Sequence, residues 1–402
     1  MKILCVSQQY WPENWRIVDA AEELVRRGHQ VTIVCGLPND SKGNLISEYR
    51  DSKNWVQSHN EVHILRVFDH PRKRGNLNLF LKYVTFAKNA TKLIDTLPGD
   101  FDVVLSNQLS PIMQVQPAVY YKKKWGTGIL MYCYDLWPES LAARKVINRG
   151  FTKPIYRHYL HISRLLYNAV DRILVTSPDY LSYLNRVDLV PFERMDYLPQ
   201  YAEDIFSLKT KPCLSFSTAH NFVFAGNVGM AQDVETLLKA AQLLSKNKDI
   251  SIHIVGSGSD VGNCKRLSKK NGLFNVFFHG SLPLENMPAA YEAADALLIT
   301  LSPVSFLNYV LPGKLQSYME YGKPIICAAN GATPKMLAEA DCGYSVPSGD
   351  YMNLAKMIEQ VSALTDDEKC KLGKNAKDYA QVHFNRRAFF DRLEVELKAL
   401  AK

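Results

Sequence analysis

Lys314 is the residue whose chemistry is easiest to assign, because it follows a Pro-Gly turn and begins a predicted helix. A lysine in the first turn of a helix combines an ammonium group with free backbone N–H groups, and this arrangement binds phosphate. When a bond to a diphosphate breaks, the leaving oxygens gain negative charge that a fixed cation stabilises. Lys314 is therefore the main catalytic candidate, and an ordinary surface lysine is the alternative. Leu311, Pro312 and Gly313 are candidate ligand contacts in the same turn.

Two strands of the same half also end in glycine turns, at 226–229 and 256–258. Such turns present backbone N–H groups to an anion, and the first leads into a predicted helix from Val234. The second turn mimics a dinucleotide fingerprint, but its third glycine is displaced to Gly262 and no acidic residue follows at the expected distance. A structural turn is an equal alternative for it. The candidate ligand contacts are Gly226, Asn227, Val228, Gln232, Gly256 and Gly258.

In the first half, Asp135 and Glu139 follow a predicted strand at 129–132. A carboxylate at this position can orient or deprotonate an acceptor hydroxyl, whereas helix N-capping is the alternative for Asp135. The Asp100-Phe-Asp102 triplet precedes its strand, so we assign it to a turn and predict no metal site. The turn after the first strand should face the cleft between the two halves of the chain. Its candidate acceptor contacts are Gln9, Tyr10, Pro12, Glu13 and Asn14.

The elements that position these residues alternate between short β-branched runs and helical periods. This alternation predicts an α/β fold with two doubly wound parallel sheets facing a cleft, and 402 residues suit two domains. We predict an acceptor-binding domain over 1–200, a nucleotide-sugar-binding domain over 201–380, and a C-terminal helix over 381–402 that packs back across the junction. The hinge is expected between Leu198 and Phe216. The predicted strands are 3–7, 31–35, 63–67, 103–106, 129–132, 173–176, 222–225, 252–255, 276–278, 297–300 and 325–328.

Composition indicates a soluble globular protein with an uneven distribution of charge. Residues 1–200 hold 26 Lys and Arg against 19 Asp and Glu, a net charge of +7 out of the total of +8. The eight cysteines form no C-x-x-C pair, which favours reduced thiols in the cytoplasm. The first residues predict a strand rather than a secretory signal. The sequence contains no run of about 20 apolar residues, so no membrane span is predicted.

Short motifs recur in a characteristic order along almost the whole chain, at 2–13, 35–39, 135–139, 198–200, 224–232, 294–295 and 312–324. Together they resemble family 4 retaining glycosyltransferases of the GT-B fold, specifically bacterial polysaccharide enzymes similar to N-acetylfucosamine and colanic acid transferases. The resemblance implies a UDP-sugar donor, with N-acetyl-L-fucosamine as the suggested sugar, and no cofactor. It also implies that the nucleotide base of the donor contacts the backbone of His279, Gly280, Ser281 and Leu282. For the His279 side chain, simple packing is the alternative.

The chain departs from the family pattern near the donor. Members often carry two glutamates eight apart, the first contacting the sugar and the second the ribose, where this chain has Tyr309 and Ser317, and Ser317 is a candidate donor contact. The usual lysine after the first glycine loop is Gln232, and Asn14-Trp15 replaces a Gly-Gly pair. Related polysaccharide transferases often have a Pro-Ser-Lys turn, which 312–314 resembles.

Basic clusters at 72–74 and 122–124 flank a predicted helix with Leu77, Phe80, Tyr83, Val84 and Ala87 at helical spacing and Lys82 and Lys88 between them. This pattern fits a surface that rests on anionic lipid, and a solvated core helix is the alternative. We expect a cytoplasmic protein, peripheral on the inner face of the membrane, that extends a lipid-diphosphate-linked glycan for O-antigen or capsule. No motif indicates nucleic acid. The alternatives are a UDP-sugar 2-epimerase of the same fold and a non-catalytic sugar-nucleotide binder.

Overall fold

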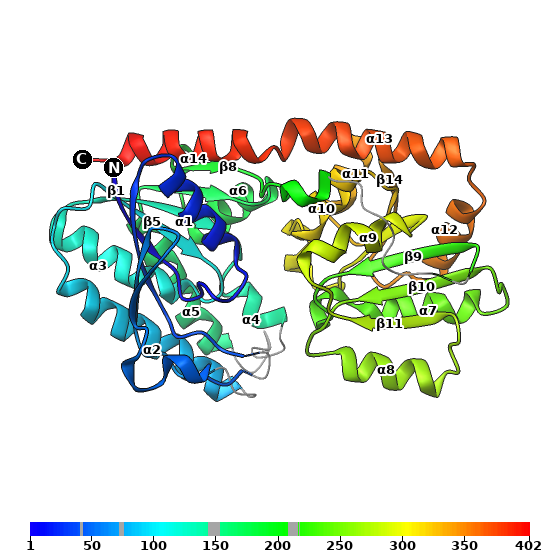
Figure 1. Cartoon of the computed structure of the whole chain (residues 1–402), viewed down its shortest axis with the longest axis horizontal. Helices are drawn as coiled ribbons and strands as arrows, with labels where there is room; N and C mark the ends of the chain where they lie inside the picture. The colour runs from blue at the N-terminus through cyan, green and yellow to red at the C-terminus, as the bar shows by residue number, and fades with distance from the viewer. Residues whose placement is uncertain (41–42, 72–75, 144–152, 208–215, 217) are drawn as a thin grey trace. The chain divides into compact units, whose positions relative to one another are not determined.

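The computed structural model describes residues 1–40, 43–71, 76–143, 153–207, 216 and 218–402. Two compact units make up the chain (Figure 1): Met1–Leu198 with Phe390–Lys402, and Pro199–Phe389. Each unit is built on a parallel sheet with helices on its faces, which confirms the predicted pair of doubly wound domains. The predicted hinge includes residues 208–215 and 217, which lie outside the described part, as do the basic residues 72–74.

The first unit contains a sheet in the order β3-β4-β2-β1-β5-β6-β7-β8, in which only β3 is antiparallel to its neighbour. All six predicted strands are present. The two edge strands, β3 and β8, were not predicted, because they are short and have few buried side chains. The strand bounds are β1 Lys2–Val6, β2 Gln30–Cys35, β3 Val56–His59, β4 Val62–Arg66, β5 Val103–Gln108, β6 Gly128–Cys133, β7 Arg172–Val175 and β8 Met195–Tyr197.

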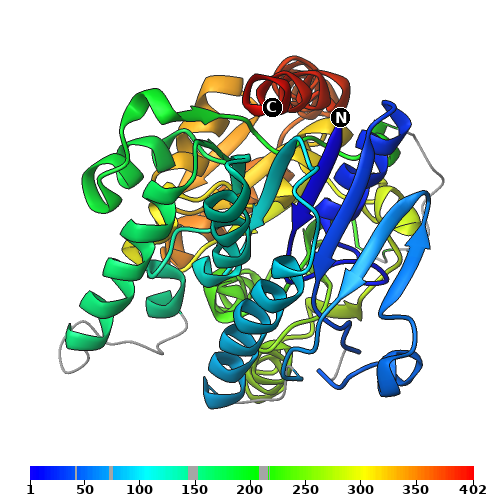
Figure 2. The same cartoon turned by 90° about the vertical axis from the view of Figure 1, so that its left-hand side faces the viewer.

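Helices connect these strands in the alternation that the sequence predicted. In α1 the side chains of Ile17, Ala20, Ala21 and Leu24 are buried, as their spacing requires. Helix α3 contacts both α2 and α5, and Figure 2 views this unit end-on. The bounds are α1 Arg16–Arg26, α2 Asn76–Asp95, α3 Gln116–Trp125, α4 Glu139–Ala143, α5 Lys153–Ala169 and α6 Asp179–Tyr183.

The end of the chain forms two helices, α13 (Asp366–His383) and α14 (Arg386–Leu400). The prediction of one helix over 381–402 is therefore wrong at 384–385. Phe384 leaves the helical conformation, and the Asn385 side chain accepts a hydrogen bond from the backbone N–H of Ala388. Residues 390–402 join the first unit, where Glu396 of α14 pairs with Arg172 at the start of β7. Helix α14 thus contacts the sheet at the amino-terminal ends of its strands and not at their carboxyl ends.

The second unit has a fully parallel sheet in the order β11-β10-β9-β12-β13-β14. Its five predicted strands are confirmed, and the edge strand β14 was not predicted. The strand bounds are β9 His220–Ala225, β10 Ile250–Val255, β11 Val276–Gly280, β12 Ala296–Thr300, β13 Ile325–Ala328 and β14 Gly343–Val346. The helices are α7 Val234–Leu244, α8 Val261–Lys270, α9 Met287–Glu292, α10 Lys314–Tyr321, α11 Ala332–Ala340 and α12 Tyr351–Ser362.

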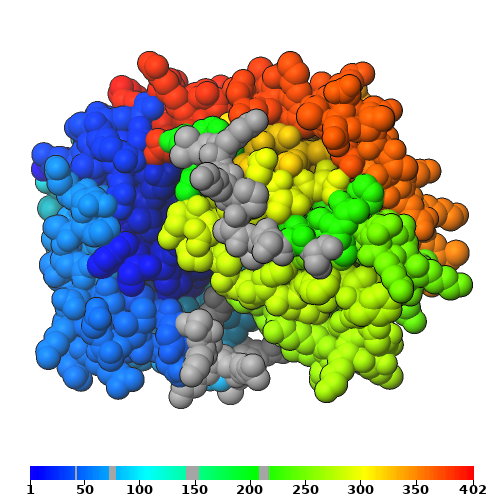
Figure 3. Space-filling model, turned by 45° about the vertical axis from the view of Figure 1, so that its right-hand side comes forward, coloured from blue at the N-terminus to red at the C-terminus, as the bar shows by residue number. Residues whose placement is uncertain are grey.

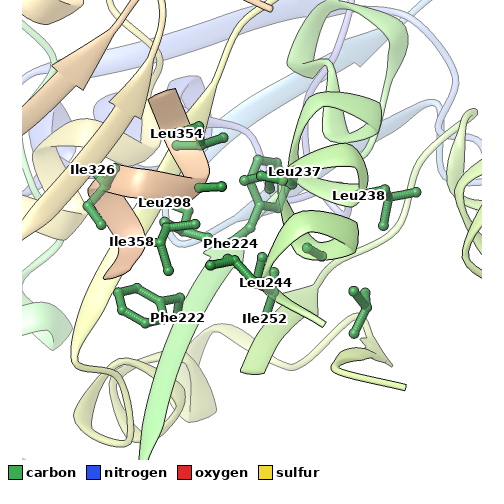
Figure 4. Close-up of a cluster of buried hydrophobic side chains, with 14 of the residues drawn as sticks. Phe222, Phe224, Leu237, Leu238, Leu244, Ile252, Leu298, Ile326, Leu354 and Ile358 are labelled. Carbon is green, nitrogen blue, oxygen red and sulfur yellow. The ribbon is translucent and has the colours of Figure 1, made fainter. Parts of the chain in front are cut away.

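A large apolar cluster lies between this sheet and α7, α8 and α12 (Figure 4). Phe222 and Phe224 of β9 meet Leu237 of α7 and Ile358 of α12, and all four side chains are fully buried. Helix α12 packs on α7, and in the space-filling view the orange α12 segment borders the green segment that contains β9 and α7 (Figure 3). The cluster holds β9 rigidly, so the loop that follows this strand starts from a fixed point.

Two findings concern the environment of the chain. Within the described residues, no helix combines the length and hydrophobicity that crossing a bilayer requires. Seven cysteines are free thiols, of which only Cys370 is exposed, and Cys213 lies outside the described part.

Candidate active site

The ammonium group of Lys314 is buried without an acceptor. Helix α10 begins at this residue, and although the side chain is partly exposed, its Nζ atom is inaccessible to solvent and makes no hydrogen bond within the described structure. Nζ lies 3.4 Å from the centroid of the Phe224 ring, whose face attracts a cation. Burial outweighs this attraction and lowers the pKa of Lys314 to about 7. An unpaired, desolvated ammonium of this kind is suited to an incoming anion.

Tyr318 fixes α10 against the end of β9. One turn after Lys314, its hydroxyl accepts a hydrogen bond from the backbone N–H of Ala225 at 2.7 Å and donates to the Ala225 carbonyl at 3.1 Å. The next residue, Gly226, has a φ of +127° and lies directly beside the lysine. A Cβ atom on Gly226 would come within 3.3 Å of Lys314 Nζ. The backbone conformation therefore favours glycine here, and a larger residue would also crowd the end of the Lys314 side chain.

The carboxyl ends of β9, β10 and β11 are hydrogen bonded to one another through the residues that follow β9 and β10. Gly226 donates its N–H to the carbonyl of Val255 at 2.8 Å, and Gly256 donates to the carbonyl of Gly280 at 2.7 Å. A Cβ on Gly256 would lie 1.8 Å from the Gly226 carbonyl oxygen, and one on Gly258 would lie 2.3 Å from that of Val228. Both glycines thus have a structural role in packing the loops. The structure brings the two predicted glycine turns and Gly280 together at the carboxyl ends of neighbouring strands.

Within the first loop, Gln232 holds the turn closed. Its Oε1 atom accepts hydrogen bonds from Asn227 Nδ2 at 3.0 Å and from the Gly229 N–H at 3.2 Å. Val228 is fully buried in the apolar cluster, so only its backbone is suited to a ligand. We conclude that Gln232 orders the loop and supplies no charge in place of the lysine that relatives carry.

In the segment that ends β11 and follows it, the His279 side chain is hydrogen bonded and the Ser281 side chain is exposed. His279 lies 3.0 Å from the Nδ1 atom of His253 on β10, and burial lowers the pKa of His279. The His279 ring is also part of an aromatic stack with His253 and Phe216. Ser281 is exposed and Leu282 is half-buried. Packing accounts for the His279 side chain, and the backbone at 279–282 stays a predicted ligand contact.

The remaining donor-side candidates lie around the first turns of α10. Leu311 is buried, whereas Pro312 and Gly313 reach the surface. Ser317 is buried, and its hydroxyl donates to a carboxylate oxygen of Glu203 at 3.0 Å. Sequence reasoning missed Glu203, because nothing in the predicted hinge segment around it identifies it as a functional residue.

In the first unit, Asp135 and Glu139 have different surroundings. Asp135 is partly exposed just after β6, and its Oδ2 atom accepts from the Ser110 N–H at 3.2 Å. Glu139 is buried, and its Oε1 atom accepts from the hydroxyls of Tyr156 at 2.6 Å and Tyr183 at 2.7 Å. Asp135 therefore remains a candidate for contact with an acceptor, whereas Glu139 belongs to a buried polar cluster.

The turn after β1 mixes structural and exposed residues. Glu13 ties this turn to a second loop, because its Oε1 atom accepts from the Asn39 N–H at 2.9 Å. Tyr10 is buried and Gln9 is half-buried, while Pro12 and Asn14 are exposed. The exposed residues are the accessible candidates for acceptor contact.

Asp102 lies in the turn before β5 and accepts from the Lys2 N–H, in agreement with its assignment to a turn.

No metal centre is evident in the described residues, where no three His, Cys, Asp or Glu side chains gather as metal ligands would. The prediction that the protein needs no metal stays a prediction.

The fold and the site define a class. Two Rossmann-like units, each built on a mostly parallel sheet, are the GT-B fold, and solved GT-B enzymes superpose over nearly the whole chain. Sucrose-phosphate synthase from Thermosynechococcus elongatus has a TM-score of 0.77 at 17% identity, with 99% of this chain and 98% of that chain covered. Alr3699/HepE from Anabaena, solved with UDP and glucose, has a TM-score of 0.73 at 16% identity, and both chains are covered completely.

Protein-family models match each half of the chain separately. Residues 14–200 match Glycosyltransferase Family 4, and residues 211–379 match Glycosyl transferases group 1. The chain therefore carries a family 4-like domain followed by a group 1 domain. It is homologous to the probable glycosyltransferase WbjE of Pseudomonas aeruginosa, to which it is 24% identical over 272 residues. That match spans 65% of this chain and 66% of WbjE, just under two thirds of the relative.

Proposed function

We propose that this protein is a retaining glycosyltransferase that moves a sugar from a UDP-sugar to a lipid-diphosphate-linked glycan. The observation that carries the proposal is the buried Nζ atom of Lys314, which has no acceptor among the described residues and lies beside Gly226, whose N–H is hydrogen bonded to the end of β10. Burying an ammonium without a partner is costly, and a diphosphate would compensate this cost. Both matching domain families are glycosyltransferases, and HepE was solved with UDP and glucose.

In the proposed reaction the second unit binds the donor. Backbone N–H groups of the glycine loops and the start of α10 hold the diphosphate, and Lys314 stabilises the negative charge that develops as the anomeric bond breaks. Asp135 of the first unit orients the acceptor hydroxyl or takes its proton. Glu139, which is bonded to Tyr156 and Tyr183, supports the position of this segment and does not contact the substrate.

We further propose that the acceptor is extended at the inner face of the cytoplasmic membrane. Helix α2 exposes Phe80, Val84 and Lys88 on one side, which is a pattern suited to a lipid surface. Lys82, which was predicted to interleave with these residues, instead points inward and pairs with buried Asp69 at 2.6 Å. The basic contribution to this surface therefore comes from Lys88 and not from Lys82.

The donor sugar and the product are assigned from resemblance. The motifs resemble N-acetylfucosamine transferases of bacterial polysaccharide synthesis, so N-acetyl-L-fucosamine is the first sugar to test, and surface polysaccharide such as O-antigen or capsule is the proposed product.

The direct test incubates the protein with a panel of UDP-sugars and a short-chain lipid-diphosphate glycan, with Lys314→Met as the inactive control. A lengthened glycan whose new linkage keeps the donor's anomeric configuration, measured by NMR, supports the proposal. Conversion of the free UDP-sugar to its epimer would instead establish an epimerase. Tight binding of UDP-sugars without any product would establish a non-catalytic binder.

A further inference from the structure

One stretch of the second unit carries an excess of positive charge. Residues 243–275 contain six Lys and Arg against two Asp, a net charge of +4. The rest of the unit, which spans 199–389, contains 13 Lys and Arg against 16 Asp and Glu, a net charge of −3. The positive charge of the unit is thus concentrated in one place, which we call the basic surface. Its basic residues are Lys246, Lys248, Lys265, Arg266, Lys269 and Lys270.

The charges of the basic surface are exposed and uncompensated. All six side chains are exposed, and none of them forms an ion pair with any residue that the structure describes. Lys265 lies over the ring of Phe278, 5.8 Å from its centroid. Arg266 donates a hydrogen bond to the side chain of Asn263 at 3.3 Å. Neither contact supplies a negative charge, so the surface is free to attract an anionic partner.

Most of the basic surface lies at the amino-terminal ends of β10 and β11. The end of α7 and the turn before β11 are joined there, because the Asn275 side chain donates to the Ala241 carbonyl at 2.9 Å. The glycine turns beside Lys314 lie at the carboxyl ends of the strands, and the six residues of β10 separate the two ends by roughly 20 Å. The basic surface is therefore distinct from the proposed diphosphate site.

Two large apolar side chains are exposed beside these charges. Phe274, in the turn before β11, is 62% exposed, and Leu243, near the end of α7, is 52% exposed. The bond between Asn275 and Ala241 brings the two turns that carry them together. Figure 1 shows α8, which carries four of the basic residues, as an outer layer of this unit. The surface therefore combines flexible cations with apolar side chains that have no cover within the described unit.

A structural role accounts for only part of this charge. Lys269 and Lys270 lie in the last turn of α8, where the helix dipole favours cations. Lys246 and Lys248 lie outside any helix, in the turn before β10, and gain nothing from a dipole. Five of the six basic residues are lysines, a type that is depleted from protein–protein interfaces. Lysines next to an exposed phenylalanine are instead typical of a surface that lies on anionic lipid.

We propose that the basic surface of the second unit binds the anionic headgroups of a phospholipid bilayer, with Phe274 and Leu243 entering the boundary between headgroups and acyl chains. Each lysine near a negatively charged leaflet adds to the attraction, and the buried apolar area adds a part that salt does not screen. The inference does not depend on the donor sugar or on the acceptor. It gives the second unit a lipid contact of its own, in addition to the one proposed for α2 of the first unit, and two linked contacts hold a chain more firmly than one.

The test is co-sedimentation of the whole chain with vesicles of phosphatidylglycerol and phosphatidylcholine in equal parts, and with vesicles of phosphatidylcholine alone. Wild-type protein should bind the anionic vesicles about 10-fold or more tightly, and less tightly as salt is added. The double change Lys246→Glu and Lys269→Glu should weaken this binding about 10-fold or more. Phe274→Ser should weaken it about 5-fold at every salt concentration. The matched control is Lys356→Glu with Lys371→Glu, which makes the same change of charge at exposed positions of α12 and α13 and should bind as wild type.

Two results would overturn the inference. The first is a double variant that sediments with anionic vesicles as well as its control does. The second is wild-type protein that binds neither kind of vesicle or both equally, which is also the result that an acidic protein partner predicts. Phe274→Ser changes a single exposed side chain, so it decides the question if the double variant does not fold.

Binding of UDP, measured by calorimetry on the same preparations, serves as the check of folding. The glycine turns lie at the other end of the strands, so the affinity for UDP should be the same in wild type and in all variants of the basic surface. Wild-type protein that binds anionic vesicles but no UDP would contradict the proposed function and support the lipid contact. The two proposals therefore fail in different measurements.

Discussion

The Nζ atom of Lys314 lies over the ring of Phe224, 3.4 Å from its centroid, and no acceptor within the described structure neutralises it. The two residues come from α10 and β9, and β9 is fixed by the apolar core around Phe222. Phe224 therefore acts as an apolar floor that keeps water from the ammonium group.

Binding of a diphosphate should depend on pH through Lys314. Burial lowers the pKa of the free lysine to about 7, and a bound diphosphate raises it again because the opposite charge favours the ammonium form. Below pH 7 the site is already charged. Above pH 7 the site must take up a proton on binding, so the affinity should fall by up to about 10-fold per pH unit. Calorimetry of UDP binding at pH 6 to 9, in buffers of different ionisation enthalpy, measures this proton uptake. An affinity that stays level to pH 9 would contradict the prediction.

Replacing Lys314 should stabilise the fold while it removes activity. Between pH 7 and the unfolded-state pKa of about 10.5, the unfolded chain binds more protons than the folded one, so the native lysine makes stability rise with pH across this window. At pH 7, Lys314→Met should therefore raise the free energy of unfolding by about 3 kcal/mol, with a smaller gain at pH 10. The turnover number should drop by about 100-fold or more. Lys239→Met, at an exposed position on α7, is the matched control and should change neither quantity appreciably.

Two glycines of the fingerprint-like segment should respond in opposite ways to alanine. In Gly256→Ala the new Cβ would lie 1.8 Å from the Gly226 carbonyl oxygen, and the native φ of +147° is strained for alanine. We expect a loss of more than about 2 kcal/mol of stability and weaker UDP binding. Gly262 lies in α8 with nothing within 4 Å, so Gly262→Ala should gain about 0.5 to 1 kcal/mol. Urea unfolding measures both changes, and a tolerated Gly256→Ala would show that the two loops are not packed as described.

Local pattern was sufficient to predict most of the fold. The spacing of Ile17, Ala20 and Leu24 identifies α1 because a helix repeats every 3.6 residues, and apolar runs identify the central strands because both their faces are buried. The edge strands β3 and β14 escaped prediction because an exposed edge has no such pattern. The break at Phe384 escaped it too, because the apolar spacing continues through it into α14.

From the sequence, only those residues of the site that belong to a local motif could be predicted. Lys314 and Gly226 follow from a strand-turn-helix pattern, but the burial of Nζ depends on Phe224, which belongs to a different element. Glu203 was out of reach for the same reason, since its contact with Ser317 joins segments 114 residues apart. Glu139 was predicted from its place after a strand, and the tyrosines that enclose it come from α5 and α6.

Asp135 and Glu139 should separate activity from stability. Glu139→Ala leaves the hydroxyls of Tyr156 and Tyr183 without their buried acceptor, so we expect a loss of about 3 kcal/mol in the free energy of unfolding. Asp135→Asn removes a partly exposed charge, and we expect a loss below about 1 kcal/mol with a fall in turnover of about 100-fold. Thermal unfolding and initial rates, measured on the same preparations, provide the comparison. Equal losses of stability in the two variants would show that both carboxylates are structural.

Binding to anionic membranes should depend on the exposed side of α2. Phe80 and Val84 are 43% and 41% exposed one turn apart, and the exposed Lys88 continues the same row. The double change Phe80→Glu and Val84→Glu removes apolar area and adds repulsion from the headgroups, so the affinity for vesicles of anionic phospholipid should fall about 10-fold or more. Val395→Glu is the control, because Val395 on α14 is 61% exposed on another element of the same unit. Vesicle co-sedimentation at low and at physiological salt measures the effect. If the double variant and the control sediment equally, the membrane contact lies on a surface other than α2.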